Sequence, residues 1–221
     1  VFEKIERMGY SICAISPMNA VNRLSDRDKN LFVPDPWTRT TPTSQRLARF
    51  LTSALTQTVN DNSKGRIEFK SVCALFYLAF TSVSFVKLFS LIPLAFASVS
   101  KKWYKSIFLD VFIASIFDKY IDRHRPDFAS IFLNAGAHIQ HHYLLNSAGI
   151  DKPSFINPTW YLSHKDDPLL DLIKAYDSLL CSIFAKKGYR FVLATGLTQV
   201  PFETPSFYYR LRNHNEFFTD L

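Results

Sequence analysis

Apolar and polar residues alternate in blocks along this chain, and short apolar runs of strand length follow segments with helical spacing. Residues 1–8 have apolar positions at helical spacing, and YSICAIS (10–16) follows as an apolar run. DFASIFLN (127–134) and YRFVLATG (189–196) repeat this order further along the chain. Three short apolar strands separated by helices predict an α/β fold with a central, mostly parallel sheet buried between helix layers.

Helical periodicity is clear in three other segments: 44–59, 105–125 and 169–188. The most apolar stretch is 71–100, whose length would suit a membrane span. Lys87 in its middle and Pro93 favour instead a buried helix that breaks near the proline. We therefore expect no membrane partner, and a protein anchored to a membrane through this stretch is a third, less favoured hypothesis.

The pattern predicts one α/β domain over residues 1–221, with a helical segment at about 66–125. Residues 17–43, rich in Pro, Asn, Asp and Thr, predict a long irregular connection that contains Asp35. The chain opens inside a helical pattern without an initiator Met and stops at NEFFTDL (215–221), which has the pattern of a helix start. The hypothesis is that this is an incomplete domain from a longer protein.

Charge, cysteine content and the absence of common motifs limit the partners, the compartment and the enzyme classes that the sequence supports. The net charge is +7, but the basic residues are scattered, and no nucleic-acid-binding motif occurs. Three cysteines, far apart and each among apolar neighbours, predict buried reduced thiols, which favours the cytoplasm. No G-x-S-x-G elbow, Walker loop, CxxC pair or dinucleotide fingerprint is present.

The candidate chemistry is concentrated directly after the predicted strand 127–134. Asn134 ends this strand, and His138, His141 and His142 follow it. If AHIQHHYLL is helical, the first two histidines lie about 60° apart on one face, and the third points elsewhere. This spacing suits two imidazoles on one metal ion, or one on a metal and one on a phosphate. Hydrogen-bonded polar residues at a helix start are the structural alternative.

Two histidines do not complete a metal site, because zinc normally takes four ligands in proteins. The other ligands would have to come from residues outside the chain or from four candidate carboxylates: Asp35, Asp127, Asp166 and Asp167.

The stretch PDFASIFLNAGAHIQHHY (126–143) resembles the alkaline phosphatase superfamily, in its type I phosphodiesterase/nucleotide pyrophosphatase branch. There, a strand delivers metal-binding residues into the active site. Residues 1–20 are similar to the helix, glycine and strand after the family's nucleophile, and LFVPDPWT (31–38) is similar to its substrate-side loop. Residues 166–180 and 189–201 resemble its last helix and metal-binding strand.

The resemblance implies a metal-dependent hydrolase of phosphate or sulfate esters with two divalent ions, zinc being favoured over manganese or magnesium. By position, His141 and His138 would be metal ligands, with Asn134, His138 and Asp35 as substrate contacts. The Thr or Ser nucleophile would lie upstream of Val1.

Two departures from the family pattern support an alternative hypothesis. The family has an Asp four residues before the ligand His, whereas this chain has Ala137 at that position. The family's Ser-Asp-His-Gly motif corresponds to Thr195-Gly196-Leu197-Thr198, which has no carboxylate or imidazole, and His214 is a remote candidate for a later ligand. The alternative is a catalytically degenerate homologue that binds an anionic ligand or partner. Whether the chain belongs to an active enzyme therefore stays open at this point, as do the exact substrate and the oligomeric state.

Overall fold

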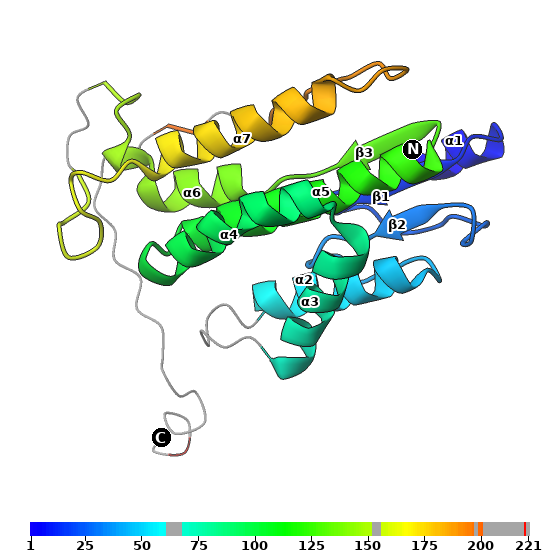
Figure 1. Ribbon diagram of the computed structural model, residues 1–221, viewed down its shortest axis with the longest axis horizontal. Helices are drawn as coiled ribbons and strands as arrows, with labels where there is room; N and C mark the ends of the chain where they lie inside the picture. Colours follow the sequence, from blue (N-terminus) through cyan, green and yellow to red (C-terminus); the bar gives the residue numbers. More distant parts are fainter. Residues whose placement is uncertain (61–67, 152–155, 197–198, 201–218, 220–221) are drawn as a thin grey trace.

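The structure is a computed structural model that describes residues 1–60, 68–151, 156–196, 199–200 and 219 (Figure 1). The helices are α1 (Phe2–Arg7), α2 (Arg46–Asn60), α3 (Phe69–Ser82), α4 (Phe85–Ser100), α5 (Tyr104–His124), α6 (Ala135–Tyr143) and α7 (Pro168–Phe184), and a 3₁₀ turn, η2 (Leu144–Asn146), follows α6. The strands are β1 (Ile12–Ile15), β2 (Leu31–Val33) and β3 (Phe128–Ile131).

The three strands form a small open sheet in the order β2-β1-β3, and both pairings are parallel. Cys13 in the central strand lies opposite Leu31 on one side and Ala129 on the other. Because successive side chains alternate between faces, Cys13 and Ile15 pack with the helical core that includes α5, while Ile12 and Ala14 pack near α1. The fold is therefore mixed α/β, with a parallel sheet among helices.

Helix α5 is the centre of the helical part. It contacts β1, β3 and four helices, and Figure 1 shows it between α7 on one side and α2 and α3 on the other. The apolar stripe expected for 105–125 is confirmed, since Ile107, Ala114 and Phe117 are buried. Arg125 ends the helix in a left-handed conformation before Pro126.

Two predictions about strands were wrong. Residues 189–196 form no strand and are mostly exposed, although Phe191 packs against the cluster of Ala114, Leu179 and Ile183. Instead, β2 lies inside the connection expected to be irregular, because a three-residue strand between Asn30 and Pro34 leaves no periodic pattern. In the described part of the chain β3 is consequently an edge strand, and it is half-buried rather than covered on both faces.

The stretch 71–100 also differs from its expected form. It consists of two helices that separate at Val83 and Ser84, where the backbone is extended, while Pro93 lies inside an unbroken α4. One face of each helix is exposed, so the prediction of a buried helix was wrong, as was that of a buried Cys73 and Cys181. None of the described helices has both the length and the apolar character needed to cross a membrane.

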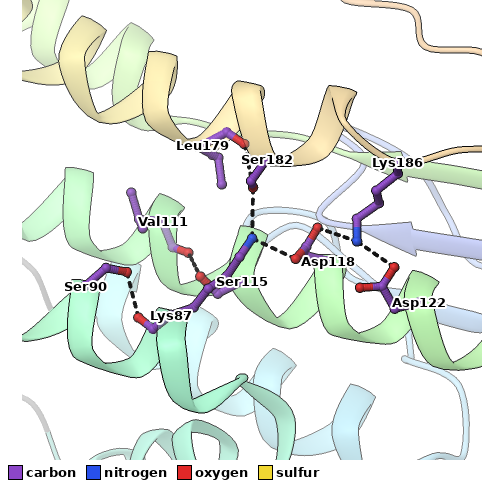
Figure 2. A network of polar contacts seen from close by, with 9 residues as sticks. All are labelled: Lys87, Ser90, Val111, Ser115, Asp118, Asp122, Leu179, Ser182 and Lys186. Atoms are coloured by element: carbon purple, nitrogen blue, oxygen red, sulfur yellow. Dashed lines mark hydrogen bonds and ion pairs between the residues drawn. The ribbon is translucent and has the colours of Figure 1, made fainter.

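A polar network joins α4, α5 and the end of α7 (Figure 2). Lys87 of α4 places its Nζ 2.7 Å from Asp118 Oδ2 and donates to Ser182 Oγ at 2.9 Å. Lys186, just after α7, lies 2.9 Å from Asp118 Oδ1 and 2.6 Å from Asp122 Oδ1. The Lys87 ammonium group, which argued against a membrane span, thus faces the interior of the protein, where Asp118 contacts both Lys87 and Lys186. Asp122, which also pairs with Lys186, lies at the exposed edge of the network.

Candidate functional site

Helix α6, which carries the three histidines, is separated from β3 by three residues. The strand register continues beyond Ile131, since the Phe132 N–H donates to the Ile15 carbonyl. Asn134 occupies the N-cap position, but its side chain makes no capping hydrogen bond. A carboxylate from another helix replaces it: Asp110 of α5 accepts from the Ala135 N–H at 2.7 Å.

Asp110 is buried where α5, α6 and α7 meet. Only 3% of the residue is exposed, and Tyr176 of α7 donates its hydroxyl to the same carboxylate oxygen. Burial raises the pKa of Asp110 to about 6, although the hydrogen bonds from Tyr176, Ala135 and Asn134 act in the opposite direction. Burial and the charge of Asp110 raise the pKa of Tyr176. The start of the histidine helix is therefore fixed by a buried, titratable contact.

The histidines that meet are His138 and His142, one helical turn apart, with ring centroids separated by 4.8 Å. This corrects the expectation that His142 points away from the other two. Tyr161 places its hydroxyl 3.3 Å from His142 Nδ1. His141 and His142 are both exposed, and the Nε2 atom of His141 lies 3.5 Å from Gln199 Nε2. All three side chains belong to one short helix, so the cluster is local.

The electrostatics of the cluster favour uncharged imidazoles. Burial lowers the pKa of His138, and the neighbouring His142 and His141 lower it further. The pKa of His142 is lowered by burial and by His141. A neutral imidazole has a lone pair available for a metal ion or a proton, so at neutral pH this pair can act as a ligand or a base.

The other predicted site residues lie apart from this cluster. Asp35 follows β2 and Asn134 follows β3, so both stand beyond the carboxyl ends of parallel strands, with β1 between them. Asp35 is almost completely buried and accepts from the backbone N–H groups of Asn19, Trp37 and Thr38 at 2.9–3.0 Å. The Asp35 carboxylate thus stabilises the loop in which it lies, and none of these three hydrogen bonds involves α6.

The remaining candidate carboxylates are likewise engaged elsewhere. Asp127 accepts from the backbone and side chain of Ser11, Asp166 pairs with Lys101, and Asp167 caps α7 through Leu170. Within the described ranges, no three His, Cys, Asp or Glu side chains are grouped so that they could hold a metal ion. Residues 197, 198 and 214, part of the family comparison, lie outside the described residues.

Asp110, Tyr161 and Tyr176 were missed by sequence reasoning. A signal for Asp110 existed, because it lies three residues after Ile107 and four before Ala114, on the apolar stripe of α5. A carboxylate in such a position is rarely buried without a partner. The tyrosines gave no comparable signal, since an aromatic residue in a helix or loop fits an ordinary core.

Comparison of the chain with protein-family models, with curated proteins and with solved structures finds no significant match. The resemblance of residues 126–143 to phosphodiesterases accordingly stays a prediction.

Proposed function

We propose that this chain belongs to a metal-dependent hydrolase of phosphate or sulfate esters, of the phosphodiesterase type with an alkaline phosphatase-like fold. The observation that carries the proposal is the contact between the imidazoles of His138 and His142, one helical turn apart, in both of which the pKa is lowered from its ordinary value. They stand on the helix that follows a parallel strand, beyond the strand's carboxyl end, where α/β sheets commonly bind ligands. The sequence resemblance supplies the reaction class.

The residues of this chain would contribute ligands and orientation. His138 would be one ligand; the resemblance favours His141 as the second, and the observed ring contact favours His142. Asn134 would contact the substrate, and Asp110 would hold the helix start in place. A bound divalent ion, zinc in the first instance, would polarise the ester and stabilise negative charge on the transferred group. Further ligands are needed beyond these imidazoles.

Zinc binding by the chain itself is the first test. Because both imidazoles face each other across one helical turn, replacing His138 and His142 together by glutamine should weaken zinc affinity at least about 100-fold. Titration calorimetry with Zn²⁺ at neutral pH measures this. The matched control is His164→Gln, which removes an exposed histidine from a loop. Equal zinc affinity in the wild type and the double variant would contradict the proposal.

Hydrolysis is the second test, and it uses the longest natural polypeptide that contains this sequence, since the resemblance places the nucleophile upstream of Val1. A fluorogenic phosphodiester and a sulfate ester are assayed with added Zn²⁺, Mn²⁺ or Mg²⁺. His141→Ala should abolish metal-dependent turnover if the resemblance assigns the ligand correctly, whereas His142→Ala should do so if the ring pair does. Full activity in both variants would overturn the assignment.

The second candidate function is a catalytically degenerate homologue that binds an anionic ligand. It is favoured by the sequence Thr195-Gly196-Leu197-Thr198, which has no carboxylate or imidazole, and by the engagement of Asp35, Asp127, Asp166 and Asp167 in other contacts. Binding of inorganic phosphate without turnover of either ester, in the presence of every metal tested, is the result that would select it.

A further inference from the structure

Helix α4 has an outward face made entirely of apolar side chains: Phe85, Phe89, Ile92, Phe96 and Val99. We call this set the α4 face. At 100° per residue these positions fall within an arc of about 80°. Phe85 and Phe96 are each 75% exposed, and Val99 is 85% exposed. Large aromatic residues gathered on one exposed face, rather than scattered singly, mark a surface that contacts a partner.

The charge of α4 is directed away from this face. Lys87 lies about 160° from its centre on the helical wheel, and Figure 2 shows the side chain pointing to Asp118 of α5 and Ser182 of α7. Because Lys87 is neutralised inside the protein, the exposed face meets its surroundings without any formal charge.

The sequence around the face carries charge of one sign only. Residues 69–109 contain five lysines and neither Asp nor Glu. Lys70, Lys102 and Lys105 are exposed, Lys102 in the turn after α4 and Lys105 in the first turn of α5, whereas Lys101 pairs with Asp166. An apolar helix face whose flanking sequence carries exposed lysines and no acidic residue complements anionic lipid headgroups that lie over apolar acyl chains.

We propose that the α4 face docks on an anionic lipid surface, with α4 lying in the plane of the interface. The helix has 16 residues and is about 24 Å long, which is shorter than a bilayer core of about 30 Å, and Pro93 lies within it. The phenylalanine side chains enter the boundary of the acyl chains, while Lys102 and Lys105 meet the headgroups. This mode differs from the membrane span considered for 71–100, and it is independent of the proposed hydrolase activity.

Co-sedimentation of the 221-residue chain with lipid vesicles tests this. We expect binding to phosphatidylcholine vesicles that contain phosphatidylglycerol, weaker binding to phosphatidylcholine alone, and a loss of that difference in high salt. Phe89→Ser with Phe96→Ser should weaken partitioning about tenfold or more, because two aromatic rings no longer enter the lipid. The control, Val192→Ser with Leu193→Ser, changes two exposed apolar residues elsewhere and should bind as the wild type does.

A second pair of variants tests the charge. Lys102→Gln with Lys105→Gln should reduce the preference for anionic vesicles about tenfold or more, while Lys4→Gln with Lys174→Gln, two exposed lysines on α1 and α7, should not. Circular dichroism confirms that each variant is folded.

Sedimentation of the free chain separates a lipid from a second copy of the protein. If the chain binds no vesicles but forms a dimer that Phe89→Ser with Phe96→Ser dissociates, the α4 face contacts a second protomer, and the lipid proposal is wrong. A monomer that sediments with neither vesicle would also overturn the proposal.

Discussion

Replacing Asp118 by alanine is expected to lower the free energy of unfolding by about 3–5 kcal/mol. The carboxylate is 11% exposed and lies within 2.9 Å of both Lys87 and Lys186, whose side chains are also largely enclosed. Without it Lys87 keeps only the hydroxyl of Ser182, so an ammonium group is left in the interior with no counter-ion (Figure 2). Urea denaturation of the wild type and the variant at neutral pH measures the difference.

Asp122→Ala is the matched control, because it removes a carboxylate from the same helix and the same network. Asp122 is 57% exposed, so the loss should stay within about 1 kcal/mol. A rescue variant adds a second check: Lys87→Met combined with Asp118→Leu removes both charges and should recover part of the stability. If Asp118→Ala and Asp122→Ala were equally mild, the network would be a surface feature rather than a link between α4, α5 and α7.

Much of the fold was predictable where one physical signal dominates. Helix α5 follows from a long apolar stripe, and α7 follows from Asp167 and Pro168 at its start, which cap and pre-shape a helix. Strand β1 follows from a buried apolar run after Gly9. In each case the local sequence and the tertiary environment favour the same structure.

Prediction failed where neighbours decide the structure. Residues 189–196 have the composition of a strand, but a strand needs a partner, and in the described chain they pair with none. Pro93 does not end α4, whereas Val83 and Ser84, which carry no strong breaking signal, separate two helices. Hydrophobicity alone also gave no indication that the α4 face is exposed.

In the candidate site too, features set by the local sequence were predictable and features set by tertiary contacts were not. The histidine cluster was visible in the sequence because three imidazoles within five residues are unusual. Which two of them meet was not, since i, i+3 and i, i+4 neighbours both share a helix face and side-chain rotamers decide between them. Asp110 contacts α6 from 25 positions away in the chain, a relation that no local pattern encodes.

The free energy of unfolding of Asp110→Asn, compared with that of the wild type, should increase as the pH rises. The folded protein raises the pKa of this carboxyl from 3.8 to about 6, so between these values the native state holds a proton that the unfolded state has lost. The wild type therefore loses stability with rising pH, by about 3 kcal/mol in all, of which about 2 kcal/mol falls between about pH 4.5 and pH 7.5. Asparagine cannot ionise and avoids this loss.

Urea denaturation of both proteins across that pH range gives the difference directly, and other titrating groups cancel from it. Tyr176→Phe provides a second test of the Asp110 pKa, because the tyrosine hydroxyl donates a hydrogen bond that lowers this pKa. Without this hydroxyl the pKa should rise above about 6, so the pH-dependent loss should extend to higher pH than in the wild type. A difference between wild type and Asp110→Asn that stays constant with pH would show that the carboxylate at the start of α6 is well solvated, and the helix junction around it would then be open rather than closed.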